Sequence, residues 1–486
     1  MLNTKTETIY NIINNEFLET SEDTKKNFSP IDSEVLVGEY QSSNEEDLNK
    51  AINAASESQK KWKKLPGVER GNYLYKVAEI LEKRSHEIAR TMTLEMGKTF
   101  PEALGETLRG VAILKYYAGE GLRKNGDVIP SSTNNTFMFT KRFPIGVVGL
   151  ITPWNFPVAI PIWKIAPALI YGNTVVVKPA SESAITTSKV IECFVEAQLP
   201  AGVINCITGS GSKLGPKLVS HPLIKAISFT GSENVGRQVG SIANQRGIKY
   251  QLEMGGKNPV IIHSDADLEL AVNETINGAF KSSGQKCTAT SKVIIHEDIY
   301  QKVTQMLIEK TQTITVGNGL EEGIWLGPCA NKNQYDSVVK FIDEAIKEGA
   351  NLLYGGQVLD IPNYENGYYL SPAIFENVSR EMKIYNEEVF GPVIILLKYS
   401  NLEEAIAIAN DSNYGLSSSI FTNNISNILN YIDEIESGLV RINAESAGVE
   451  LQAPFGGMKN SSTGYREQGE AAKEFYTETK TIFIKG

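Results

Sequence analysis

One cysteine lies in a sequence context that suits chemistry. Cys287 occurs in SSGQKCTAT, where small residues on both sides allow a ligand to approach the backbone closely. A thiolate is a strong nucleophile at neutral pH. Lys286 beside it would lower the thiol pKa, although adjacent side chains on an extended chain point apart. Taken alone, the segment fits an inert buried cysteine better, and Cys193, Cys206 and Cys329 are expected to be packing residues.

Two further residues offer a general base and a hydrogen-bond donor. Glu253 in QLEMGGKNP precedes two glycines, a setting that suits a base with a raised pKa. Asn155 in TPWNFP follows an apolar run, and its amide is a donor of the kind that stabilises an oxyanion. Read separately, they also fit a surface glutamate at a strand end and an asparagine in a turn.

Two segments have features of nucleotide sites. Lys178 in VVVKPAS ends a buried run, where a residue that contacts a ribose is expected, although a strand-end lysine in solvent fits equally. FTGSENVG, residues 229–236, follows a second run and opens a helix, so backbone donors and the Ser232 hydroxyl suit a pyrophosphate. The usual G-x-G-x-x-G is absent, and GSGSKLG at 209–215 is one residue too long.

These residues are placed by a repeating order of apolar β-branched runs and helical segments. Between the second and third runs, residues 185–198 have helical periodicity. This order predicts a parallel, doubly wound sheet, which binds ligands beyond the carboxyl ends of its strands. The runs are 145–151, 174–178, 203–207, 225–229 and 258–262.

Other elements are expected on both sides of this region. Ser43 and Glu46 match the S-x-x-E capping box that begins a helix. Helical periodicity then covers about 68–122, with a break near Gly97, and TETKTIFIKG at the C-terminal end suggests a β-arm. A second α/β set is expected from about 266, with strands over 291–295 and 392–398 and helices over 298–312 and 332–348.

Composition excludes several classes of protein. The 486 residues carry 47 basic and 57 acidic side chains, and a net charge of −10 argues against nucleic-acid binding. Four cysteines and four histidines, widely spaced, predict neither a disulfide scaffold nor a metal site. The apolar stretch 145–163 contains three prolines, so no membrane span is expected, and MLNTKTETIY does not resemble a signal peptide. A cytoplasmic location is expected.

Seven motifs occur together in an order that resembles the aldehyde dehydrogenase superfamily over nearly the whole chain. They are TPWNFP, KPASE, FTGS, LEMGGKNP, GQKCTA, EEVFGPV and PFGGMKNSS. The resemblance implies an α/β fold with a doubly wound, Rossmann-like cofactor domain, an α/β catalytic domain and a small β oligomerisation arm. It implies a cofactor domain over 1–122 and 144–253, a catalytic domain over 254–459, and an oligomerisation element over 123–143 and 460–486. A homodimer or homotetramer is expected.

The resemblance also implies a role for each matched residue. Cys287 is expected to attack the aldehyde carbon, and Asn155 with the Cys287 N–H to stabilise the thiohemiacetal oxygen. Loss of hydride to the nicotinamide leaves a thioester, which water activated by Glu253 hydrolyses. The cofactor is NAD or NADP, and the residues expected to contact it are Trp154, Lys178, Ser181, Gly231, Ser232, Glu388 and Phe390.

Cofactor choice and substrate are less narrowly defined. NAD-preferring members often have a glutamate where this chain has Ser181, so NADP use is also expected. The segments GQKCTATSK and 443–469 are most similar to the branch that oxidises 2-oxoglutarate semialdehyde (2,5-dioxopentanoate). Phe156 and Phe455 are expected to form pocket walls or to be core residues, and Arg466 or Lys286 to bind the substrate carboxylate.

Three alternatives stay open beside this interpretation. A succinate semialdehyde dehydrogenase or a broad-specificity aldehyde dehydrogenase would carry the same motifs. A cofactor-free cysteine hydrolase would need a histidine near Cys287, and would leave the cofactor motifs unexplained. A non-catalytic family member would be expected to lose Cys287 or Glu253, and both are present.

Overall fold

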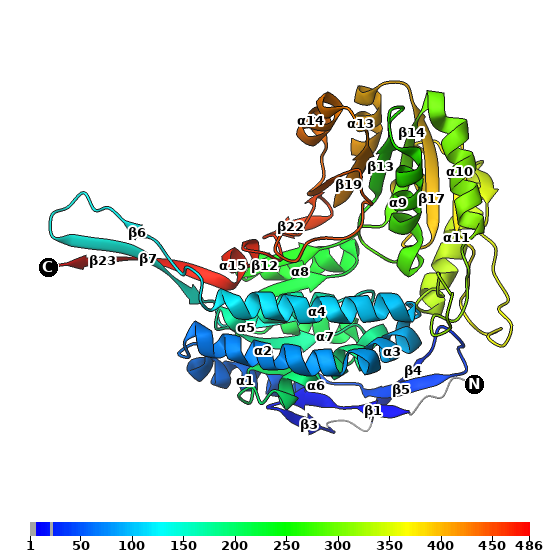
Figure 1. Cartoon of the computed structure of the whole chain (residues 1–486). Coiled ribbons are helices and arrows are strands. Elements are labelled where there is room, and N and C mark those ends of the chain that lie inside the picture. Colours follow the sequence, from blue (N-terminus) through cyan, green and yellow to red (C-terminus); the bar gives the residue numbers. More distant parts are fainter. Residues whose placement is uncertain (1–5, 20–22) are drawn as a thin grey trace.

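A computed structural model describes residues 6–19 and 23–486, so residues 1–5 and 20–22 of the predicted cofactor domain lie outside the described residues. The chain forms two α/β halves and a projecting arm (Figure 1). The first half is built on an eight-stranded sheet in the order β22-β12-β11-β8-β9-β10-β2-β3, whose five central strands are parallel. The strands are β2 (Asn11–Ile13), β3 (Glu16–Leu18), β8 (Val147–Ile151), β9 (Thr174–Lys178), β10 (Ile204–Cys206), β11 (Ile224–Thr230), β12 (Lys249–Glu253) and β22 (Ser462–Gly464).

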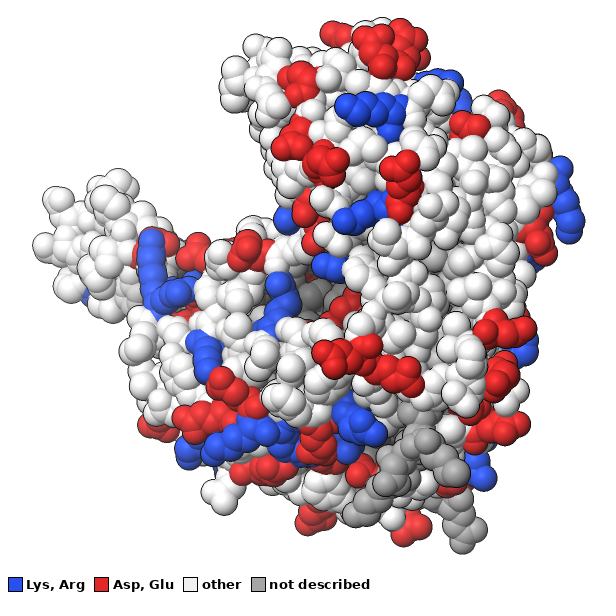
Figure 2. Space-filling view, turned by 45° about the vertical axis from the view of Figure 1, so that its right-hand side comes forward, with Lys and Arg blue, Asp and Glu red and all other residues white. Residues whose placement is uncertain are grey.

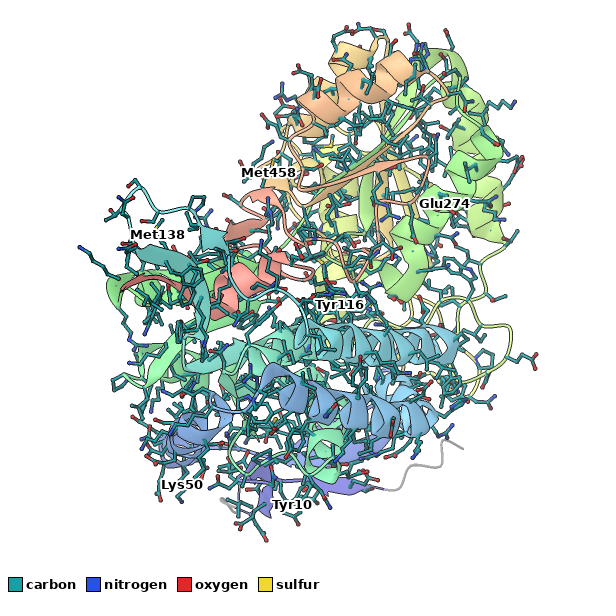
Figure 3. The ribbon with its side chains drawn as sticks, turned by 60° about the vertical axis from the view of Figure 1, so that its left-hand side comes forward. Tyr10, Lys50, Tyr116, Met138, Glu274 and Met458 are labelled. Atoms are coloured by element: carbon teal, nitrogen blue, oxygen red, sulfur yellow. The ribbon has the colours of Figure 1, made fainter. Side chains whose placement is uncertain are left out.

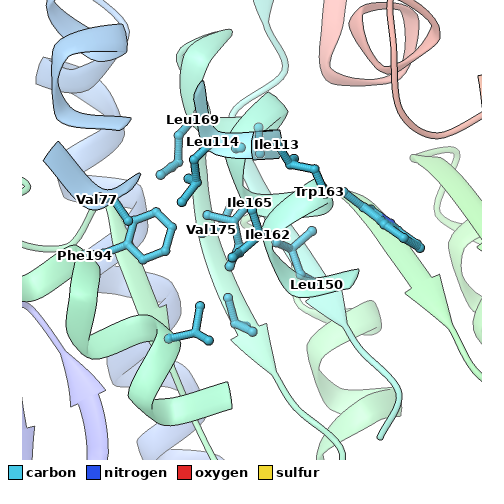
Figure 4. Packing of buried hydrophobic residues seen from close by; sticks show 14 of the residues in the cluster. Val77, Ile113, Leu114, Leu150, Ile162, Trp163, Ile165, Leu169, Val175 and Phe194 are labelled. Carbon is cyan, nitrogen blue, oxygen red and sulfur yellow. The ribbon is translucent and has the colours of Figure 1, made fainter. Parts of the chain in front are cut away.

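This sheet is covered by helices on both faces, which confirms the doubly wound arrangement. Alternating side chains of β9 enter two apolar cores, with Val175 and Val177 in one and Val176 in the other. Figure 4 shows Val175 in the first core beside Ile165 and Phe194. That core is formed with α2 (Gly67–Lys83), α3 (Ser85–Met96), α4 (Phe100–Glu120), α5 (Ala159–Ile170) and α6 (Ala184–Glu196), and the other with α1 (Glu45–Trp62), α7 (Gly211–Ser220) and α8 (Glu233–Gln245).

The first helix begins one residue later than the capping motif predicted. Asn44 Oδ1 accepts hydrogen bonds from the backbone N–H groups of Glu46 and Asp47, at 2.8 and 3.1 Å. Asp47 Oδ2 accepts from the Asn44 N–H at 3.0 Å, which completes the box. The prediction of Ser43 and Glu46 was therefore wrong, because the Ser43 hydroxyl donates to Asn11 Oδ1 at 2.8 Å.

The second half contains a seven-stranded sheet in the order β15-β16-β17-β14-β13-β19-β20, parallel except for β15. The predicted helix over 332–348 is α11 (Lys332–Glu348). The strands are β13 (Asn258–Ile262), β14 (Thr290–His296), β15 (Asn351–Tyr354), β16 (Ala373–Glu376), β17 (Val393–Tyr399), β19 (Ser417–Phe421) and β20 (Leu439–Ile442). The other helices are α9 (Leu268–Phe280), α10 (Tyr300–Gln312), α12 (Lys383–Asn386), α13 (Leu402–Asn410) and α14 (Ile425–Glu434).

The arm is an antiparallel sheet of β6 (Val128–Ile129), β7 (Thr136–Pro144) and β23 (Thr477–Lys485). It projects from the body, and Met138 on β7 lies well away from both halves (Figures 1 and 3). Phe483 and Ile484 are 65% and 54% exposed there, so the arm presents apolar side chains to its surroundings. β22, within the stretch 460–486 assigned to the oligomerisation element, pairs instead with β12 of the first sheet.

Smaller elements complete the described structure. A separate sheet is formed by β1 (Glu7–Ile9), β4 (Thr24–Phe28) and β5 (Leu36–Gln41), and β18 (Tyr414–Gly415) pairs with β21 (Met458–Lys459). Helix α15 (Ala471–Tyr476) leads into β23. Within residues 6–19 and 23–486, the helices are all too short or too polar to cross a bilayer. On the face in Figure 2, acidic and basic side chains are interspersed, and a hollow opens where the halves meet.

Candidate active site

A cavity of about 280 Å³ brings together seven of the predicted site residues. It lies at the carboxyl ends of β8 and β11, where a doubly wound sheet binds its ligands. The seven are Trp154, Asn155, Gly231, Ser232, Cys287, Glu388 and Phe390, and the wall is completed by Pro153, Ile160, Thr230, Met254, Gly255, Gln334, Ser337 and Val389. Two motifs far apart in the sequence meet here, since the rings of Trp154 and Phe390 pack edge to face at 5.5 Å.

Cys287 is positioned by an unusual stretch of backbone just before it. Ser282, Ser283 and Gly284 all have left-handed φ values, of 56°, 55° and 68°. Such conformations are costly for serine and persist only where neighbours hold them. The Ser282 N–H donates to Glu102 Oε1 at 2.7 Å, and the Ser283 hydroxyl donates to the Gly327 carbonyl at 2.7 Å. The turn therefore projects the half-buried thiol into the cavity.

Asn155 is held next to this turn. Its Nδ2 donates to the Gln285 carbonyl at 3.0 Å, and Asn258 Nδ2 donates to the Cys287 carbonyl at 2.9 Å. An amide nitrogen has two N–H donors, so one remains for a ligand oxygen. The side chain is 5% exposed, which keeps the donor away from competing water. Asn155 and Cys287, which were predicted to act together, therefore line the same cavity.

Helix α4 holds both segments through residues that the sequence patterns did not single out. Glu106 Oε1 accepts from the backbone N–H groups of Val158 and Ala159, at 2.9 and 3.1 Å. Its Oε2 accepts from Lys98 Nζ at 2.5 Å, and Lys98 also donates to the Asn155 carbonyl at 2.9 Å. The sequence did contain a signal that could have identified this role. Glu102 and Glu106 lie one turn apart on a helix whose inner face is otherwise apolar.

The charge around Cys287 differs from the prediction. Burial raises the pKa of the thiol, and the carboxyl groups of Glu388 and Glu253 raise it further. Lys286 does not lower it, because its buried ammonium donates to the Asn277 carbonyl at 3.1 Å on α9. The expected help from Lys286 was therefore wrong. Among the described residues, the charged groups that act most strongly on this thiol therefore disfavour its thiolate form.

Glu253 lies close to the cavity but does not line it. Its Oε2 accepts from the Ser462 hydroxyl at 2.5 Å, and its Oε1 is buried without a hydrogen-bond partner in the described structure. Burial raises the pKa of this carboxyl well above its usual value, and Glu467 raises it further. Glu467 is itself buried and paired with Lys164. An unpartnered oxygen and a raised pKa are what a general base requires.

The remaining cavity wall fits a dinucleotide cofactor. Thr230 Oγ1 is buried without a hydrogen-bond partner in the described structure, so a polar group is available to a ligand. Helix α8 begins at Ser232 without a side-chain cap, which leaves its first N–H groups free for a phosphate. Glu388 Oε1 accepts from the Gly256 N–H at 2.9 Å, and burial raises the pKa of its carboxyl to about 7.

Besides Glu253, four predicted residues lie outside the cavity wall. Lys178 ends β9 and donates to the Pro179 carbonyl at 2.7 Å, and burial lowers its pKa to about 8. Ser181 donates to the Gly209 carbonyl at 3.3 Å. Phe455 is buried against the Trp163 ring at 5.4 Å, and Phe156 lies under the Lys98 ammonium at 3.9 Å from its centroid. The two phenylalanines therefore have the core contacts that were one of their two expected roles.

Comparisons with known proteins identify relatives along the whole chain. The model of the aldehyde dehydrogenase family matches residues 17–482. An alpha-ketoglutaric semialdehyde dehydrogenase of Bacillus subtilis is 58% identical over 99% of both chains. A 2,5-dioxopentanoate dehydrogenase of Saccharolobus solfataricus is 39% identical over 94% of this chain and 95% of its own. The crystal structure of betaine aldehyde dehydrogenase from Staphylococcus aureus in complex with NAD+ superposes with a TM-score of 0.95, at 33% identity over 98% and 94% of the two chains.

The electrostatics of the cavity predict how fast Cys287 is alkylated. Substitution of Glu388→Gln removes a carboxylate that raises the thiol pKa, so iodoacetamide should modify Cys287 severalfold faster at mildly alkaline pH. Mass spectrometry of the labelled peptides measures this rate. The buried thiols of Cys193, Cys206 and Cys329 should remain unmodified in the native protein.

The neighbouring acid provides a matched control. Glu387 is exposed and is not among the groups that shift the Cys287 pKa, so Glu387→Gln should leave the labelling rate unchanged. Equal rates in Glu388→Gln and the unsubstituted protein would contradict the influence of Glu388 on the thiol.

Proposed function

Because the chain belongs to the aldehyde dehydrogenase family, we propose that it oxidises 2-oxoglutarate semialdehyde to 2-oxoglutarate with NAD+ or NADP+. The observation that carries the reaction type is the meeting of Cys287 and Asn155 in one cavity with Trp154, Glu388 and Phe390. The substrate is supported by the Bacillus subtilis and Saccharolobus solfataricus relatives and their coverage of nearly the whole chain. No histidine is among the residues that line this cavity, which disfavours a cofactor-free cysteine hydrolase.

The first chemical step uses Cys287 and Asn155. Once the thiol proton has passed to water, the sulfur forms a bond to the aldehyde carbon while the carbonyl electron pair moves to oxygen. The unused N–H of Asn155 then donates to that oxygen, and one such donor lowers a barrier by roughly 3–4 kcal/mol. The 282–284 turn fixes the sulfur beside the amide, so little orientational freedom is lost when the substrate binds.

The cofactor is held by the wall on the other side of the sulfur. A bound NAD(P)+ would supply the hydride acceptor that the oxidation requires. Glu388, whose carboxylate accepts from the Gly256 N–H, would bind the nicotinamide ribose, and Phe390, which packs against Trp154, would contact the nicotinamide. Ser232, Gly231 and the free N–H groups at the start of α8 provide donors for the phosphates. Lys178 and Ser181 extend the same edge toward the adenosine ribose.

Release of the acid requires Glu253 to turn from Ser462 toward the thioester. Its buried position excludes competing ion pairs, and its raised pKa makes it an effective acceptor of a proton from water. The water oxygen then bonds to the acyl carbon, the carbon–sulfur bond breaks, and Cys287 is regenerated. The dependence on an ionised Glu253 means that hydrolysis becomes faster as pH rises through this raised pKa.

The domain boundaries, the oligomeric assembly and the cellular location are part of the same proposal. The described halves support a cofactor domain over 1–122 and 144–253 and a catalytic domain over 254–459, with an oligomerisation element over 123–143 and 460–486. The exposed edge and apolar side chains of the arm support pairing with a second subunit, as a homodimer or a homotetramer. The proposal also includes a cytoplasmic location for the enzyme, with small molecules as its substrate and cofactor.

A panel of aldehydes tests the proposed substrate. 2-Oxoglutarate semialdehyde should have a kcat/KM at least about tenfold higher than hexanal, because an ion pair to the carboxylate adds binding energy. Steady-state formation of the reduced cofactor measures both values. Cys287→Ala should abolish cofactor reduction with every aldehyde. Equal kcat/KM for the two aldehydes would contradict the substrate, and activity in Cys287→Ala would contradict the mechanism.

Substitution of Glu253→Gln separates the two half-reactions. Cofactor reduction should still occur once per active site, while steady-state turnover falls by about a hundredfold or more, because the base that activates water is lost. Rapid mixing with aldehyde and cofactor would record this burst, and the rise of turnover with pH should disappear. Loss of the burst together with turnover would argue that Glu253 acts before the thioester forms.

Ser181 predicts that NADP is a usable cofactor. In the sequence, its neutral hydroxyl replaces a carboxylate that would repel a 2′-phosphate, so initial rates with NADP should be measurable beside those with NAD. Ser181→Glu should lower the NADP-to-NAD rate ratio by about tenfold. Glu182→Gln is the control, since this acid acts on Lys178 at longer range and should change the ratio by less than about twofold. Complete inactivity with NADP would refute the prediction.

A further inference from the structure

The cofactor wall occupies one side of Cys287, so the aldehyde has to approach from the other side. We place three apolar side chains on that opposite side, because they pack against the same buried cluster as Cys287: Phe156 on the segment before α5, and Val449 and Leu451 of the loop 443–453. None of these three residues is part of the cavity wall that fits the dinucleotide. Helix α4 runs along the same side, between the two halves (Figure 1).

Helix α4 presents three charged residues on one stripe toward this region. Glu102, Glu106 and Arg109 are separated by four and three residues, the spacing of one helix face. Glu102 binds the Ser282 N–H before the nucleophile, and Glu106 binds the N–H groups at the start of α5. Arg109, the third, donates through Nη2 to the Val449 carbonyl of the loop. The stripe therefore contacts each of the three segments around the aldehyde side of Cys287.

Arg109 is a half-buried cation that lacks a carboxylate partner. Among the described residues no carboxylate oxygen lies at ion-pair distance from it, because the nearby Glu106 is engaged by Lys98. A guanidinium has five N–H donors, and within residues 6–19 and 23–486 Arg109 makes one hydrogen bond, to Val449. Burial lowers the pKa of this guanidinium, while Glu450 and Glu106 act against that effect at longer range. Holding an unpaired cation here costs stability that a bound anion would restore.

The other cations near the site are already engaged. Lys98 pairs with Glu106, and Lys286 donates to the Asn277 carbonyl. Arg466, the second cation expected to bind the substrate, donates to the Gly457 carbonyl and acts on Glu253. Lys98 and Lys286 would have to break these contacts before they could bind a carboxylate, and the charge of Arg466 already acts on the buried Glu253 carboxyl.

We propose that Arg109 binds the terminal carboxylate of the substrate, and so selects short aldehydes that carry an acid group at the far end. This inference rests on the proposed function and identifies the residue that gives it substrate specificity. Two parallel N–H···O bonds from one guanidinium fit a carboxylate and fix its orientation. With the acid end held at α4, the aldehyde end extends past Phe156 toward Cys287 and the Asn155 amide.

Substitution of Arg109→Met tests this assignment through the ratio of kcat/KM values for two aldehydes. The kcat/KM for 2-oxoglutarate semialdehyde, divided by that for pentanal, should fall by about tenfold to a hundredfold, the range expected for loss of a charged hydrogen bond. The loss should lie mainly in KM for the acid substrate. Added salt should weaken the preference of the unsubstituted enzyme for the acid and have little effect on the variant.

Two further variants separate specificity from a structural effect. Arg441 donates to the Gly448 carbonyl at 3.1 Å, next to Val449 on the same loop, so Arg441→Met removes an equivalent loop contact. It should leave the ratio unchanged, whereas Arg109→Lys should recover part of it because the charge is kept. The proposal would be overturned if kcat/KM fell equally for both substrates in Arg109→Met, or if the ratio changed as much in Arg441→Met. Inactivity of the unsubstituted enzyme toward every aldehyde would instead refute the proposed function.

Discussion

The buried carboxylate of Glu106 is the interaction on which the arrangement of the site depends. It accepts two backbone N–H groups at the start of α5 and pairs with Lys98, which in turn holds the Asn155 carbonyl. Both members of the pair are at most 2% exposed in their side chains. Removing one partner of such a pair costs about 3–5 kcal/mol, because the other is left as an uncompensated buried charge. The amide donor and the first-half core are therefore stabilised by the same contacts.

Much of the fold followed from patterns along the chain, and the failures have physical causes. Runs such as 174–178 predicted β9 residue for residue, because a strand buried on both faces is continuously apolar. Asn44 caps the first helix in place of the predicted Ser43, because the Ser43 hydroxyl binds the distant residue Asn11. Local spacing in the sequence does not reveal that contact. The contact of β22 with β12 likewise joins residues about two hundred positions apart, beyond any periodicity.

The candidate active site was likewise predictable from the sequence only in part. Cys287, Asn155 and Glu388 were identified by motif and do share a cavity. Their protonation was not accessible from sequence, since the pKa shifts come from burial and from acids on other segments. Arg109 was overlooked because an arginine on a helix is ordinarily a surface residue, and only packing against loop 443–453 shows that it is enclosed. Local sequence patterns are least able to predict which charged residues tertiary contacts bring to an active site.

The arm joins two strands that lie far apart in the sequence. β7 near residue 140 pairs along nine positions with β23, which is made more than three hundred residues later. During synthesis every strand of the two large sheets, including the edge strand β22, is made before β23 completes this ladder. Any surface that the complete ladder provides is therefore absent from a nascent chain that lacks residues 477–485. If subunits pair through the arm as proposed, their association has to wait until each chain has been translated through β23.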